Sequence, residues 1–275
     1  MKQRGFLAAL VLLFAWRGVA AHELWLEPLK WQAAPDTEIR VAILLGTGMQ
    51  GSQQIYMPAS FRRFEQITPS GSRPVTGRMG DRPAGNLTAK GDGLNLFVYE
   101  TTPRLVQYDH LDDFAAFARK KGYPEAEDQH RSKGLPETSF VERYTRHAKS
   151  LISIGTPAAP AAGEDRRLGL EVEFIARENP YRWQAGPLVF ALEVDGMPRP
   201  DAQVTVMYRQ SGIPDAAVTE MVLRTDAKGM IGFTPRRGYI YLLDHVDLAA
   251  ATREEADGAR WISRWGSLTF LVPDA

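Results

Sequence analysis

Five histidines carry most of the metal-binding potential of this 275-residue chain, which contains no cysteine. They are His22, His110, His130, His147 and His245. A neutral imidazole is a common metal ligand, and the absence of thiols excludes disulfides, iron–sulfur clusters and thiolate zinc sites. No two of these histidines lie at the spacing of a local zinc motif such as HExxH. A metal site would therefore have to be assembled by the fold.

The N-terminal segment predicts a cleavable secretory signal that ends just before the first histidine. Lys2 and Arg4 form a basic start, an apolar run covers Phe6–Trp16, and small residues end at Ala21. The apolar run is too short to cross a bilayer as a helix, which favours cleavage after Ala21 over an uncleaved membrane anchor. Export to the periplasm would make His22 the first residue, with an α-amine and an imidazole that can chelate one metal ion.

His245 is the predicted distant partner of His22. It lies in the strand expected over 238–248, where alternation puts it on one face with Asp247, while Asp244 interrupts the opposite, apolar face. Two nitrogens of His22 and one of His245 would form a histidine brace, a site suited to copper or nickel. Asp244 and Asp247 are the residues expected to fix the tautomer of His245. The alternatives are that His22 is an accident of the cut and that His245 lies on a polar surface.

The other histidines are less favoured as metal ligands. His110 lies in an acidic cluster with Asp109, Asp112 and Asp113 that could bind a cation, although aspartates at a helix start are better explained by the helix dipole. His130 lies in a polar stretch and is expected to be solvated. His147 lies among Arg143, Arg146 and Lys149, whose positive charges disfavour the approach of a cation.

Motifs for several enzyme classes are missing from the sequence. There is no GxSxG, no phosphate-binding loop and no GxGxxG before a helix. Glu171 and Glu173 lie on one face of an expected strand, a weak signal for a glycosidase because such pairs are common on solvated strands. Basic and acidic residues balance at 33 each, which does not support nucleic-acid binding. The sequence therefore favours a binding protein over an enzyme.

Short alternating segments separated by Gly, Pro and Asp turns predict a mainly β protein. We expect two immunoglobulin- or prealbumin-like sandwich domains, over 22–155 and 167–275, after the signal at 1–21. The Pro/Ala/Gly-rich stretch at 156–166 is the predicted linker. A helical insertion is expected near 109–121, followed by a polar loop over Tyr123–Glu137. The next segment, Ser139–Ile154, is compatible with a helix or with a strand that has Arg146 and Ala148 on one face.

Several blocks in order resemble one known family. The segments are His22–Pro28 (HELWLEP), Pro83–Gly85, Glu142–Leu151, Asn179–Tyr181, Thr225–Gly229 and Trp265–Phe270. Together they resemble the periplasmic family known as domain of unknown function 4198. The resemblance implies β-sandwich domains, a metal site that uses His22 and His245, and an accessory role in nickel or cobalt uptake. It implies no catalytic residues.

Three functions are expected from these observations. The first is a periplasmic metal-binding accessory protein that captures nickel, cobalt or copper and passes the ion to a membrane metal transporter. The second is a metal-free binding or scaffold module of the cell envelope, and the third is an oxidative copper enzyme built on the same brace. After processing, no segment approaches the length of a membrane span, so the chain is not expected to be an integral membrane protein.

Overall fold

The computed structural model describes residues 22–68, 70–155, 163–252 and 258–274. The predicted signal at 1–21 and the first part of the predicted linker lie outside the described residues. Within them, the chain is mainly β, as the sequence predicts, and forms three sheets. The largest sheet lies between the other two.

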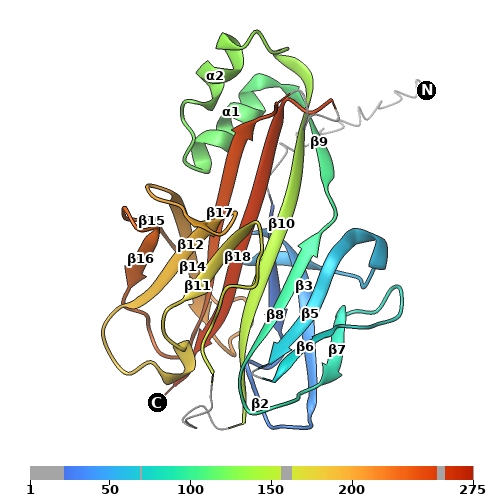
Figure 1. Ribbon diagram of the computed structural model, residues 1–275, viewed down its shortest axis with the longest axis vertical. Helices are drawn as coiled ribbons and strands as arrows, with labels where there is room; N and C mark the ends of the chain where they lie inside the picture. Colours follow the sequence, from blue (N-terminus) through green and yellow to red (C-terminus); the bar gives the residue numbers. More distant parts are fainter. Residues whose placement is uncertain (1–21, 69, 156–162, 253–257, 275) are drawn as a thin grey trace, which may run out of the picture.

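The central sheet contains ten strands. In spatial order they are β15 (Thr219–Arg224), β14 (Gln203–Gln210), β17 (Tyr239–Ala250), β18 (Trp261–Val272), β10 (Thr138–Ile154), β8 (Gly93–Thr101), β5 (Phe61–Thr68) and β6 (Gly71–Pro74), with β2 (Gln32–Ala33) and β9 (Arg104–His110) also paired to β10. The long strands β10, β17 and β18 run along the longest dimension of the molecule (Figure 1). The segment 139–154 is thus a strand, and its alternation does place Arg146 and Ala148 on one face.

Two smaller sheets cover the faces of the central one. The first consists of β1 (Glu23–Pro28), β3 (Glu38–Thr47), β4 (Gln50–Gln54) and β7 (Gly85–Thr88). The second consists of β11 (Val172–Ala176), β12 (Leu188–Val194), β13 (Met197–Pro198) and β16 (Met230–Phe233). Short 3-10 helices occur at η1 (Pro58–Ser60) and η2 (Pro180–Arg182).

Contacts along β18 show that the two small sheets lie on opposite faces. The hydroxyl of Ser267 donates to the carbonyl of Leu24 in β1 at 2.7 Å. Its neighbour Gly266 instead faces Val172 of β11. Adjacent residues of a strand point to opposite faces, so the β1 sheet and the β11 sheet sandwich the central sheet. In the central sheet, β10 of the first predicted domain pairs with β18 of the second, so strands of both predicted domains share one sheet.

Two helices cover one end of the β1-side face. They are α1 (Leu111–Lys120) and α2 (Ala126–Ser132), and both lie at the top of the molecule in Figure 1. In α1, apolar side chains at helical spacing face inward, and Phe117 stacks on Trp265 with ring centroids 5.7 Å apart. Neither helix has the length and apolar composition needed to span a bilayer.

The prediction of a polar loop over Tyr123–Glu137 is wrong for its central part, which forms α2. The expectation that His130 is solvated is also wrong, because its side chain is completely buried. The indole of Trp261 donates to Nδ1 of His130 at 3.0 Å, so Nε2 carries the proton and donates to the Pro136 carbonyl at 2.9 Å. The side of α2 that faces the protein is thus formed by Ala126 and by His130, whose buried ring nitrogens are both hydrogen-bonded.

Candidate functional site

His147 and His245 lie in one row of the central sheet, on either side of a glycine. His147 of β10 is in register with Gly266 of β18, which is in register with His245 of β17. Residues in one row point to the same face, so both imidazoles face the β11 sheet. A Cβ on Gly266 would lie 2.5 Å from Cγ1 of Val172, so the missing side chain allows β11 to approach this row closely.

His147 presents an unused nitrogen in a buried position. The residue is 1% exposed, and its Nδ1 lies 3.3 Å from the carbonyl oxygen of Trp265. A carbonyl only accepts hydrogen bonds, so Nδ1 carries the proton and Nε2 carries a lone pair. That Nε2 atom is buried and has no hydrogen-bond partner. Burial, followed by the charges of Arg62 and Arg264, lowers the pKa of His147 to about 3, so the ring is neutral near pH 7.

Two carboxylates face this lone pair. Oε2 of Glu171 lies 3.9 Å from Nε2 of His147, and the ligand atoms of Glu100, His147 and Glu171 all lie within 4.8 Å of one another. Glu100 comes from β8, which pairs with β10, while Glu171 directly precedes β11. Burial is the main influence on Glu100 and raises its pKa, although Arg62 acts in the opposite direction. Both the central sheet and the β11 layer are therefore needed to build the group.

A cation would relieve the electrostatic conflict in this group. A lone pair and two carboxylate groups repel one another when they converge without a positive charge between them. Arg62 supplies part of that charge, since its guanidinium lies 3.6 Å from an oxygen of Glu100 and 3.6 Å from an oxygen of Glu171. Neither distance is that of a good hydrogen bond. One imidazole nitrogen and two carboxylate oxygens are suitable ligands for a divalent first-row metal.

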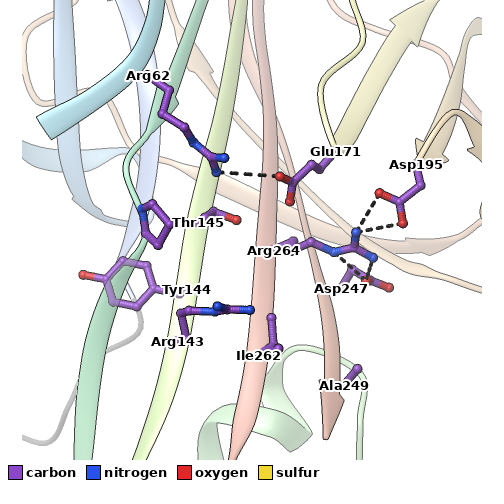
Figure 2. Close-up of a pocket in the computed structure, with 11 residues that line it drawn as sticks. Arg62, Arg143, Tyr144, Thr145, Glu171, Asp195, Asp247, Ala249, Ile262 and Arg264 are labelled. Atoms are coloured by element: carbon purple, nitrogen blue, oxygen red, sulfur yellow. Dashed lines mark hydrogen bonds and ion pairs between the residues drawn. The ribbon is translucent and has the colours of Figure 1, made fainter. Parts of the chain in front are cut away.

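A cavity of about 390 Å³ opens beside the group (Figure 2). Charged and polar side chains dominate its lining, among them Arg62, Arg143, Thr145, Glu171, Asp195 and Arg264. Thr145 precedes His147 by two residues on β10 and therefore shares its face. The Thr145 hydroxyl oxygen is buried and has no hydrogen-bond partner. Two unsatisfied polar atoms from one strand face thus lie in or beside the cavity.

The predicted ligand His245 has a similar but poorer environment. It is 2% exposed, its Nδ1 lies 2.8 Å from the Gln203 carbonyl oxygen, and its Nε2 is buried without a partner. Burial lowers its pKa to about 4. Its predicted neighbour Asp247 is held by ion pairs with Arg199 at 3.0 Å and Arg264 at 2.7 Å. His245 is therefore a buried neutral imidazole. The carboxylate of Asp247 is engaged by Arg199 and Arg264.

The other predicted residues lie on the opposite face of the central sheet. Asp244 binds Lys121 at 2.8 Å, and Lys121 also binds Glu23 of β1 at 2.9 Å. His22 directly precedes β1, is exposed, and accepts a hydrogen bond at its carbonyl from Arg146 at 3.1 Å. The central sheet separates His22 from His245, and the structure does not bring this predicted pair together.

Sequence reasoning did not assign Glu100, His147 and Glu171 to a site. The basic neighbours of His147 in sequence predicted that a cation is disfavoured there; of these, Arg146 points to the opposite face and stacks over Tyr144 and Trp265. The ammonium of Lys149 forms buried ion pairs with Asp165 and Glu173, with Nζ 2.9 and 3.0 Å from their carboxylate oxygens. Glu173 is thus engaged in a buried ion pair, whereas Glu171 makes only longer ion-pair contacts, at 3.6 Å to Arg62 and 3.9 Å to His147. Strand alternation around His147 was the signal that could have found the site.

Comparison with known proteins gives a family match but no assigned activity. Residues 19–246 match the family model described as Domain of unknown function (DUF4198). No curated protein matches the chain. Among solved structures, a DUF4785 family protein from Legionella pneumophila matches at 8% identity with a TM-score of 0.24, over 80% of this chain and 50% of that one. Trypsin-activated alpha-2-macroglobulin from Escherichia coli matches at 10% identity with a TM-score of 0.22, over 92% of this chain and 16% of that one. The chain spans half or less of these two proteins, and such TM-scores carry no functional argument.

Proposed function

The chain belongs to the DUF4198 family, a domain of unknown function, and on that premise we propose that it is a periplasmic protein that binds one divalent metal ion at Glu100, His147 and Glu171. Nickel, cobalt and copper are the proposed metals. Copper would bind most tightly by the usual order of divalent affinities, so supply would select among them.

One observation supports this proposal above all others. Nε2 of His147 is buried, has no hydrogen-bond partner, and lies 3.9 Å from a carboxylate oxygen. Burying a polar atom without a partner costs about 1 to 3 kcal/mol, so such an atom calls for an explanation. A metal ion between Nε2 and the two carboxylates would satisfy it.

The proposed location and partner rest on the sequence. The basic start, short apolar run and small residues before His22 favour export to the periplasm. An exported metal-binding protein without an enzyme motif fits an accessory role, in which it passes its ion to a membrane metal transporter. Mass spectrometry of the exported protein should find His22 as the first residue, and a longer mature chain would contradict the proposed processing.

Calorimetric titration of the chelator-stripped, exported protein with Ni²⁺, Co²⁺ and Cu²⁺ tests the metal site. We expect about one ion to bind per chain. His147→Asn should weaken binding by at least roughly a hundredfold, because it removes the nitrogen ligand itself, and loss of a partner that only orients a ligand already costs about 10- to 100-fold. His245→Asn is the matched control, since it changes an equally buried imidazole in the same row, and it should leave the affinity unchanged.

The outcomes separate the candidate functions. Loss of binding in His22→Ala and His245→Asn, with His147→Asn unaffected, would contradict the proposed site and support the histidine brace. Absence of binding by all three metals would contradict the proposal and support a metal-free envelope module.

A further inference from the structure

The proposed metal ion would have open coordination positions on the side of the cavity. The chain offers one ligand atom from each of three residues. Divalent first-row ions in proteins take about four to six ligands. Glu171 is both a member of the group and part of the cavity lining. A bound ion would therefore reach the cavity, where additional ligands have space to bind.

The cavity has a size and a polar feature suited to a small molecule. Its volume of about 390 Å³ lies within the range of roughly 300 to 1,000 Å³ common for small-molecule sites. The buried hydroxyl of Thr145 has no partner within the protein. A hydroxyl can donate one hydrogen bond, so it would suit an oxygen atom of a ligand that also coordinates the ion.

Charge balance indicates that this ligand is an anion. Glu100 and Glu171 together cancel the charge of a divalent ion, which leaves the positive charge of Arg62. Arg62 lies 3.6 Å from Oε1 of Glu100 and 3.6 Å from Oε1 of Glu171, whereas Oε2 of Glu171 faces His147. A metal ion bound by these carboxylates would draw on their negative charge and weaken their attraction for Arg62. The Arg62 side chain is 43% exposed, so it has freedom to turn toward the cavity. A guanidinium binds a carboxylate with two parallel hydrogen bonds.

The other charged residues of the cavity lining are two arginines and two aspartates, so they add no net charge to the sum of the metal ion, the two glutamates and Arg62. Arg264 forms two hydrogen bonds with Asp195, at 2.7 and 2.8 Å, and an ion pair with Asp247 at 2.7 Å. Figure 2 shows this pairing on the wall opposite Arg62. With Arg143 also in the lining, two arginines offset two aspartates. The net positive charge of the metal-loaded cavity therefore remains.

We infer, building on the proposed function, that the protein takes its metal as a complex with a small carboxylate chelator. The ion is held by Glu100, His147 and Glu171, and the chelator fills the cavity with a carboxylate on Arg62 and an oxygen near Thr145. A protein of this kind captures metal that is already complexed outside the cell.

Equilibrium dialysis with Ni²⁺ and radiolabelled citrate tests this inference on the whole exported protein. We expect about one citrate to be retained per chain when Ni²⁺ is present, and none with citrate alone. Arg62→Ala should weaken citrate retention by about tenfold or more at Ni²⁺ concentrations that saturate the variant, with its own Ni²⁺ affinity measured first. Thr145→Val should have a smaller effect in the same direction. Arg40→Ala is the matched control, because Arg40 is an exposed arginine of β3 and does not line the cavity.

The two proposals fail in different ways. If Ni²⁺ binds but citrate removes it without being retained, the chelator inference is overturned and the metal site stands. Equal citrate retention by Arg62→Ala and the unmodified protein would also overturn it. If Ni²⁺ binds neither alone nor with citrate, the metal site itself is wrong.

Discussion

Glu142 provides a direct test of how burial controls the stability of this fold. It is 2% exposed and accepts hydrogen bonds from the hydroxyls of Tyr108, at 2.8 Å, and Ser263. Loss of hydration outweighs these two bonds and the charge of Arg146, and raises the pKa of Glu142 from 4.5 to about 7. Glu142→Gln removes the charge and keeps the shape. Both hydroxyls can donate or accept, so both hydrogen bonds can persist.

The size and sign of the effect follow from this pKa. The folded state holds the proton more tightly than the unfolded chain does, so the stabilising contribution is complete below pH 4.5. It is lost as the pH rises through about 7. A rise from 4.5 to about 7 corresponds to about 3 kcal/mol. Glutamine does not titrate, so Glu142→Gln should be more stable than the unmodified protein by up to this amount near pH 8 and nearly equal to it near pH 4.

Urea unfolding followed by tryptophan fluorescence at several pH values measures this difference. The lowered pKa values of His147 and His245 favour folding at higher pH, but both proteins share them and they cancel in the comparison. Glu38→Gln, at an exposed position, should show no such gap. If Glu142→Gln had the same pH dependence as the unmodified protein, or were less stable near pH 8, the burial argument would be refuted.

Two further predictions concern the packing around the central sheet. Lys121→Met should lower the free energy of unfolding in urea by about 3 to 5 kcal/mol, because it leaves Glu23 and Asp244 buried without their shared cation; a loss below about 1 kcal/mol would count against a tightly coupled ion cluster. Gly266→Ala should cost about 1 to 3 kcal/mol in thermal melts, since its Cβ would meet Val172 at 2.5 Å. Adding Val172→Ala should recover part of the stability lost in Gly266→Ala. A double variant no more stable than Gly266→Ala would show that the contact with Val172 is not the cause.

Local patterns in the sequence predicted the β class, α1 and the faces of single strands. Alternation along 238–248 correctly placed His245 with Asp247 and opposite to Asp244, because side chains of a strand alternate whatever lies above them. The same rule, applied to β10, separates Arg146 from His147. Arg146 is next to His147 in sequence but lies on the other face, since adjacent strand residues face different layers.

The errors arose where distant side chains determine local structure. The segment that forms α2 is polar in sequence, and its inward turn depends on a hydrogen bond between His130 and Trp261, which are 131 residues apart. No local periodicity contains this information. A polar segment folds inward when a distant partner satisfies its buried polar atom.

The sequence by itself determined the chemical inventory: no thiol, five histidines and many carboxylates, on strands whose faces alternate. Only the tertiary structure decided which of these groups converge. Glu100 reaches His147 through the pairing of β8 with β10, and Glu171 reaches it because Gly266 lets β11 pack closely on the central sheet. His22 and His245 were separated by the same stacking, because a sheet presents its two faces to different layers.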